Sequence, residues 1–105
     1  MIYQGGNLPI RFEFDSDMEK VKEIHITIYA ANGKQLKQWE KEELTISNKL
    51  ITAPLSQEET LSFPCGKIQI EIKWLNPDTY VELAEVIWDR VAGRNDHSIL
   101  GGDSH

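Results

Sequence analysis

Residues 67–75 read Lys-Ile-Gln-Ile-Glu-Ile-Lys-Trp-Leu, and this stretch decides the fold class. Its apolar members are Ile68, Ile70, Ile72 and Trp74, and a polar residue separates each from the next. Successive side chains of a strand point to opposite faces of a sheet, so an alternation of period two indicates a strand with one buried face. The stretch therefore predicts a β-strand whose apolar residues, Trp74 included, belong to the core.

The same alternation recurs along most of the chain. The further predicted strands are residues 8–14, 23–30, 34–40, 44–46, 50–55 and 80–91. Turn residues separate them, and about seven short strands with regular turns favour two packed antiparallel sheets. The predicted fold class is therefore all-β, an immunoglobulin-like antiparallel β-sandwich with one short helix. A β-barrel is the main alternative.

Local signals add detail to this prediction. Asn32-Gly33 between two strands predicts a type I′ hairpin turn, which requires positive φ at both positions. Leu36 and Trp39 are three residues apart, so we expect a bulge near Lys37 or a change of face. Pro9 at the start of the first strand suits an edge, because proline donates no backbone hydrogen bond.

One helix is predicted from a capping box. The Ser56 hydroxyl can accept a hydrogen bond from the amide of Glu59, and the Glu59 carboxylate can reach back to Ser56. The helix would begin at Ser56 and end before Pro64. Residues 1–92 form the predicted domain, and residues 93–105, rich in glycine and polar residues, form a predicted flexible tail.

Charge and composition narrow the range of functions. The 105 residues carry 11 basic and 17 acidic side chains, for a net charge of -6, and no basic stripe that would bind a phosphate backbone. The single cysteine, Cys65, excludes an intramolecular disulfide. No apolar run approaches the length of a membrane helix, and no signal peptide is evident at the start. We expect no binding to nucleic acid or membrane, and a protein made in the cytoplasm.

No arrangement of residues predicts catalysis. Nucleophilic catalysis requires a base beside a serine or cysteine. Of the three histidines, His25 is expected on a solvent-facing side of its strand, while His97 and His105 belong to the tail region. Cys65 is expected to be a small buried hydrophobic residue. We therefore predict a protein that is not an enzyme and has no small-molecule substrate.

Acidic residues also fail to predict a metal or glycosidase site. Asp15, Asp17 and Glu19 alternate in a loop but lack the glycine and the final glutamate of a calcium-binding EF-hand. Glu58 and Glu59 are adjacent and point in different directions, unlike a glycosidase carboxylate pair. The remaining candidates, in the tail, are Asp96, His97, Asp103 and His105, where no rigid scaffold holds them. No cofactor or metal is predicted.

The aromatic residues suggest where a partner could bind. Ala84, Val86 and Trp88 would share the buried face of the last strand, which places Trp88, like Trp74, in the core and Ile87 on the opposite face. Tyr29, Trp39 and Ile87 are the residues of a possible interaction surface, and packing of Tyr29 and Trp39 in or at the border of the core is the alternative. Exposed aromatic side chains on a sheet can stack on sugars or on a partner protein.

The chain also resembles a known group of proteins. Leu55-Ser56-Gln57-Glu58-Glu59-Thr60-Leu61-Ser62-Phe63 and the following Ile68-Gln69 are similar to a motif in small proteins encoded by prophages of Gram-positive gut bacteria. The resemblance extends to Phe12, Phe14, Asn32-Gly33 and Cys65, and covers residues 8–92. A weaker similarity, from Gly5 to Phe12, is to the N-terminal domain of phage baseplate upper proteins.

This resemblance implies a structural or adaptor component of a phage or prophage particle, in its tail or baseplate. The implied partners are other phage structural proteins or further copies of the chain, and the protein would move from the host cytoplasm into the virion. The resemblance transfers no functional residues. Two alternatives stay open: a carbohydrate-binding module with a row of exposed aromatics, and a cytoplasmic protein-interaction domain.

Overall fold

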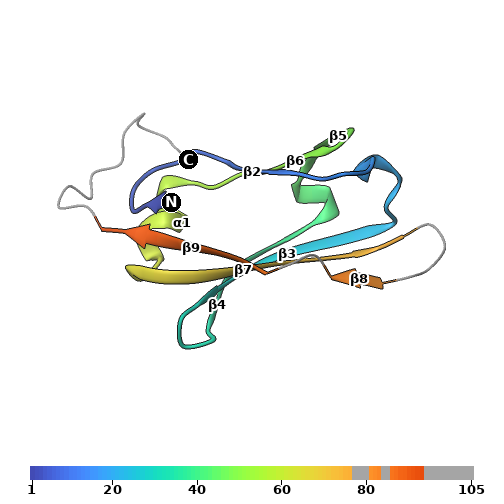
Figure 1. Cartoon of the computed structure of the whole chain (residues 1–105). Helices are drawn as coiled ribbons and strands as arrows, with labels where there is room; N and C mark the ends of the chain where they lie inside the picture. The colour runs from blue at the N-terminus through green and yellow to red at the C-terminus, as the bar shows by residue number, and fades with distance from the viewer. Residues whose placement is uncertain (77–80, 84–85, 94–105) are drawn as a thin grey trace.

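Two β-sheets pack face to face in the computed structural model, which describes residues 1–76, 81–83 and 86–93 (Figure 1). The large sheet has the order β1 (Ile2–Tyr3), β9 (Ile87–Ala92), β7 (Gly66–Leu75), β3 (Glu23–Ala30), β4 (Gln35–Glu40), and β8 (Val81–Leu83) also pairs with β7. The small sheet has the order β2 (Ile10–Glu13), β6 (Leu50–Ala53), β5 (Thr45–Ser47). The prediction of an all-β sandwich is confirmed.

The stretch that predicted the fold class lies at the centre of the large sheet. β7 pairs antiparallel with β3 along its length and with β8 and β9 on its other side. Ile68, Ile70 and Ile72 are buried, as predicted. Trp74 is half-buried and packs against this core, where its ring meets Phe14 of the other sheet edge-on with the centroids 5.7 Å apart. Alternate residues of β7 and β3 therefore form the centre of the large sheet's contribution to the core.

The β3–β4 hairpin confirms one local prediction and corrects another. The register shifts where Ile28 lies opposite Lys37 and Tyr29 opposite Gln35, so a bulge lies at Leu36 as expected. The turn is not type I′, because only Gly33 of the Asn32-Gly33 pair has positive φ, at 89°. The Asn32 side chain instead accepts a hydrogen bond from the amide of Lys34, which holds a longer loop ending in a left-handed glycine.

The predicted helix is confirmed as α1 (Gln57–Ser62), with Ser56 as its N-cap and both capping-box hydrogen bonds to Glu59 present. Two 3₁₀ turns were not predicted, η1 (Met18–Lys20) and η2 (Lys41–Glu43). η1 explains the acidic loop, since Asp17 caps it and Glu19 accepts a hydrogen bond from the amide of Asn48. Two of the three carboxylates of this loop, those of Asp17 and Glu19, therefore have structural partners.

The first strand is shorter than predicted. β2 begins at Ile10, two residues later than predicted, and Leu8 before it is 79% exposed. Pro9 precedes β2, which is an edge strand as expected. β1 was not predicted, because its two residues pair parallel with β9 at Val91 and Ala92, a contact distant in sequence.

The last strand contains the largest error of the prediction. Leu83 lies opposite Lys73, and Ile87 lies opposite Ile70. The chain therefore advances four residues from Leu83 to Ile87 while β7 advances only three. One extra residue inverts the faces of every residue after it. Ile87 therefore packs inward and Trp88, 58% exposed, faces solvent, the reverse of the prediction. Residues 77–80, 84–85 and 94–105, which include Ala84 and most of the predicted tail, lie outside the described residues.

Candidate functional site

The structure separates the three residues of the predicted interaction surface. Tyr29 is half-buried on the outer face of the large sheet, the face turned away from the small sheet. Trp39 is 1% exposed, and its indole N–H donates to the carbonyl of Pro54 at 2.9 Å, so its placement on the surface was wrong. Ile87 packs against the core. Only Tyr29 of the three lies on an outer face.

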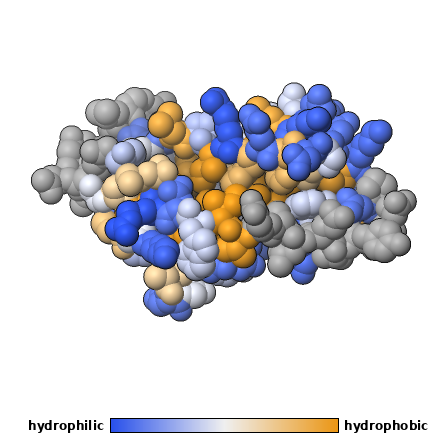
Figure 2. All heavy atoms as spheres, viewed as in Figure 1, coloured by the Kyte–Doolittle hydropathy of each residue, from blue (hydrophilic) through white to orange (hydrophobic). Residues whose placement is uncertain are grey.

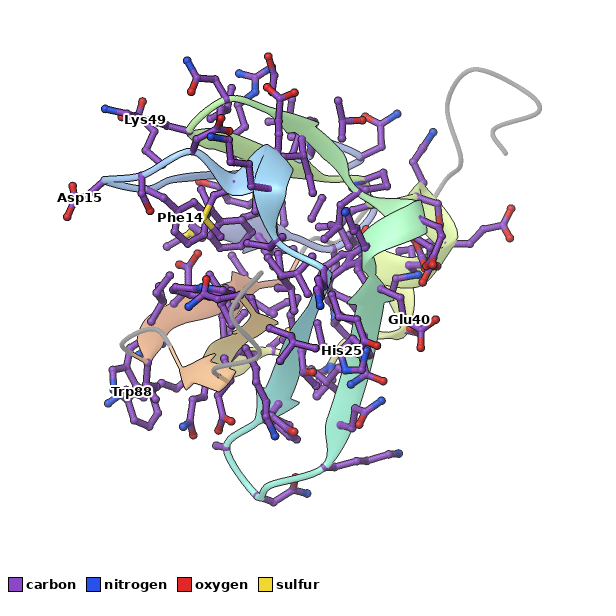
Figure 3. All side chains as sticks on the ribbon, turned by 90° about the vertical axis from the view of Figure 1, so that its right-hand side faces the viewer. Phe14, Asp15, His25, Glu40, Lys49 and Trp88 are labelled. Atoms are coloured by element: carbon purple, nitrogen blue, oxygen red, sulfur yellow. The ribbon has the colours of Figure 1, made fainter. Side chains whose placement is uncertain are left out.

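An unpredicted cluster accompanies Tyr29 on the outer face. Pairing of β3, β7 and β9 places Tyr29, Gln69 and Trp88 side by side in one row across the three strands. In Figure 3, Trp88 projects away from the small sheet, whereas Phe14 lies between the sheets. The alternation within residues 86–92 could not reveal this, because either face of β9 carries apolar residues.

Two cations adjoin this row. Lys67 and Arg90 form a directly opposed cross-strand pair on the same outer face, and both are exposed. The Lys67 Nζ lies 4.9 Å from the centroid of the Trp88 ring, within the range of a cation–π contact. We call Lys67, Trp88 and Arg90 the basic–aromatic cluster.

A cleft opens between the sheets on the side where β2 and β9 lie. It has a volume of about 600 Å³, and Phe14, Ile72, Trp74 and Ile87 are among its lining residues. Figure 2 shows hydrophobic residues gathered in the middle of this side, between the two sheets. The charged side chains of β2 border it. A cleft of this size, lined by both apolar and polar side chains, suits side chains of a partner as well as a small ligand.

The strands beside this cleft have open edges. Phe14 donates its amide to Lys49, so residues 10, 12 and 14 direct their backbone groups to β6, and Arg11 and Glu13 direct theirs away from it. No described strand pairs with that outer side of β2. The other edge strand, β9, is paired by β1 only at Val91 and Ala92 among the described residues. Unpaired edges of this kind can accept another strand.

A second hollow of about 310 Å³ lies beside α1 and contains an ion pair between Lys37 and Glu59. Partial burial would raise the pKa of Glu59, but the hydrogen bond from Lys37 and those from Ser56 outweigh burial, and the pKa is lowered. Both oxygens of Glu59 have structural partners, one being the N-cap amide. Glu59 therefore has a structural role in this hollow, at the start of α1.

The structure places Cys65 and His25, the described residues that were considered for catalysis. Cys65 is exposed, which corrects its predicted burial, because it lies in the turn that leads into β7. His25 lies 3.8 Å from Glu40 on the outer face, with no serine or cysteine opposite either residue. Among the described residues, no group of three histidine, cysteine, aspartate or glutamate side chains could hold a metal ion. No helix there is long and apolar enough to cross a membrane.

Comparisons with known proteins agree with the fold. The crystal structure of CopC from Methylosinus trichosporium OB3b is similar, with a TM-score of 0.58 and 10% sequence identity, over 87% of this chain and 98% of that chain. At this identity the likeness concerns the fold alone. No family model and no curated protein matches the chain.

Proposed function

We propose that the chain is a non-catalytic structural or adaptor subunit of a phage or prophage particle, in its tail or baseplate, that assembles through strand edges. The observation that carries this proposal is the open edge of β2 beside a cleft lined by both apolar and polar side chains. An incoming strand would add to that edge through backbone hydrogen bonds and place alternate side chains in the cleft. The sequence resemblance supplies the biological setting.

The cleft supports this mode of assembly chemically. Backbone groups of Arg11 and Glu13 supply donors and acceptors along one border. Phe14, Trp74 and Ile87 supply an apolar floor behind them. Backbone pairing gives affinity largely independent of sequence, and side-chain pockets give specificity. One fold can thus recognise a particular neighbour in a particle.

A carbohydrate-binding module is the second candidate, and one observation favours it. Trp88 and Tyr29 lie in one row on the exposed outer face, as a stacking platform for sugars would require. However, Lys67 lies over the Trp88 ring and Tyr29 is half-buried, so little planar surface is presented. We therefore rank this function below assembly.

Two substitutions at one position test the assembly proposal. Glu13→Pro removes the N–H that points away from β6 and leaves the internal ladder intact, whereas Glu13→Ala removes only the side chain. The tagged proteins are used to capture partners from a lysate of an induced, prophage-bearing host, and captured proteins are identified by mass spectrometry. We expect a phage structural protein with the parent chain and Glu13→Ala, and its loss with Glu13→Pro.

Circular dichroism of both variants serves to check that each is folded. A glycan array uses the same preparations in parallel. Micromolar binding to one glycan, without capture of any phage protein, would replace the assembly proposal by the carbohydrate one. Equal capture by Glu13→Pro and Glu13→Ala would show that the β2 edge is not the docking site.

A further inference from the structure

The basic–aromatic cluster is unusual for a protein with this charge. The whole chain carries a net charge of -6, yet Lys67 and Arg90 lie directly opposite one another on neighbouring strands. Like charges in that arrangement repel and destabilise a sheet. Among the described residues, neither cation forms an ion pair with a carboxylate, since the ion pairs there involve Met1, His25 and Lys37. Apart from the contact of Lys67 with the Trp88 ring, no contact found among the described residues offsets the repulsion.

An anionic partner would remove this repulsion. A carboxylate placed between Lys67 and Arg90 would accept hydrogen bonds from both, and Arg90 presents a planar fork suited to carboxylates. Trp88 beside them is 58% exposed, and tryptophan and arginine are the residue types enriched at interface hot spots. The cluster thus combines two cations that lack a carboxylate partner with one exposed aromatic side chain.

We propose that the outer face of the large sheet, at Lys67, Trp88 and Arg90, docks an acidic segment of a partner protein. This inference goes beyond the proposed function, because it concerns a different surface from the β2 edge and the cleft. It holds whether or not strand addition occurs at β2.

Charge complementarity selects an acidic peptide over other anions. Nucleic acid requires a longer basic stripe, whereas the next row along this face contains Glu71. An anionic saccharide requires an open aromatic face for stacking, and Lys67 covers the ring of Trp88. A peptide requires neither, because its carboxylates reach the two cations from extended, flexible side chains while its apolar atoms contact the edge of the indole.

The test measures binding of a fluorescently labelled hexaglutamate peptide to the full chain by anisotropy at low and high salt. Lys67→Ala and Arg90→Ala are each expected to weaken binding up to about fivefold, as for exposed charge pairs, and the double variant more. Lys73→Ala is the matched control, since Lys73 is an exposed lysine on the same strand and face, away from Trp88. It is expected to change affinity little. Hexaglutamine is expected not to bind.

A second readout locates the peptide. In nuclear magnetic resonance spectra, the indole N–H signal of Trp88 is expected to shift on titration, and that of buried Trp39 is expected to stay in place. Equal weakening by Lys73→Ala would show general charge attraction and overturn the site. Tighter binding of an oligogalacturonate than of hexaglutamate would overturn the peptide as its ligand. These variants leave β2 unchanged, so failure here is separate from failure of the strand-edge proposal.

Discussion

Replacing Trp39 by phenylalanine tests how the structure divides the tryptophans between core and surface. Trp39 is 1% exposed, and its indole N–H donates to the Pro54 carbonyl, which joins β4 to the segment that precedes α1. Phenylalanine keeps most of the ring but leaves that carbonyl without its donor. Loss of one partner of a fully buried hydrogen bond costs about 1–3 kcal/mol, and because this bond is only partly buried we expect a cost at the low end of that range.

Trp88→Phe is the matched control, because it makes the same chemical change on an exposed ring. Surface substitutions away from special features change stability by about 0.5 kcal/mol or less. Trp39→Ala would remove the ring as well, at a cost of about 3–5 kcal/mol. Since small domains have a total stability of about 5–15 kcal/mol, the phenylalanine pair is the safer comparison.

The assay is urea unfolding followed by far-ultraviolet circular dichroism, which does not depend on tryptophan emission. Trp39→Phe is expected to lower the free energy of unfolding, and Trp88→Phe to leave it nearly unchanged. A larger loss for Trp88→Phe would contradict this assignment, because it would place Trp88 in the core and give β9 the opposite orientation.

Three further predictions concern stability. Trp74→Ala is expected to cost less than the roughly 3–5 kcal/mol of a fully buried ring, since Trp74 is half-buried, and its urea midpoint is compared with that of Trp39→Ala. Gly66→Ala is expected to cost roughly 1–3 kcal/mol through backbone strain alone, since Gly66 has φ of 122° and open space around it; an unchanged thermal midpoint would contradict this. The pKa of Glu59 is lowered in the folded chain, so its ionised carboxylate adds to the free energy of unfolding above the ordinary glutamate pKa. This stabilisation is lost as the pH falls and the carboxylate is protonated. Glu59→Gln is expected to make the free energy of unfolding depend less on pH in this acidic range.

Much of the fold was predictable because it depends on local patterns. The alternation in 67–75 and 23–30 determined two central strands and their buried isoleucines, since a strand exposes alternate residues to one face whatever it pairs with. The capping box at Ser56 and Glu59 determined where α1 begins, because its hydrogen bonds span three residues. The spacing of Leu36 and Trp39 likewise indicated the bulge in β4.

The candidate site, in contrast, was decided by tertiary structure. Trp88 and Ile87 lie on the faces opposite to those predicted, because one extra residue enters between β8 and β9. Both residues are apolar, so the sequence pattern is equally compatible with either face. Lys67 and Arg90 are far apart in the chain and become neighbours only through the pairing of β7 with β9. Strand register is a long-range property, set by the packing of both sheets together, and it alone brings these charges and Trp88 onto one surface.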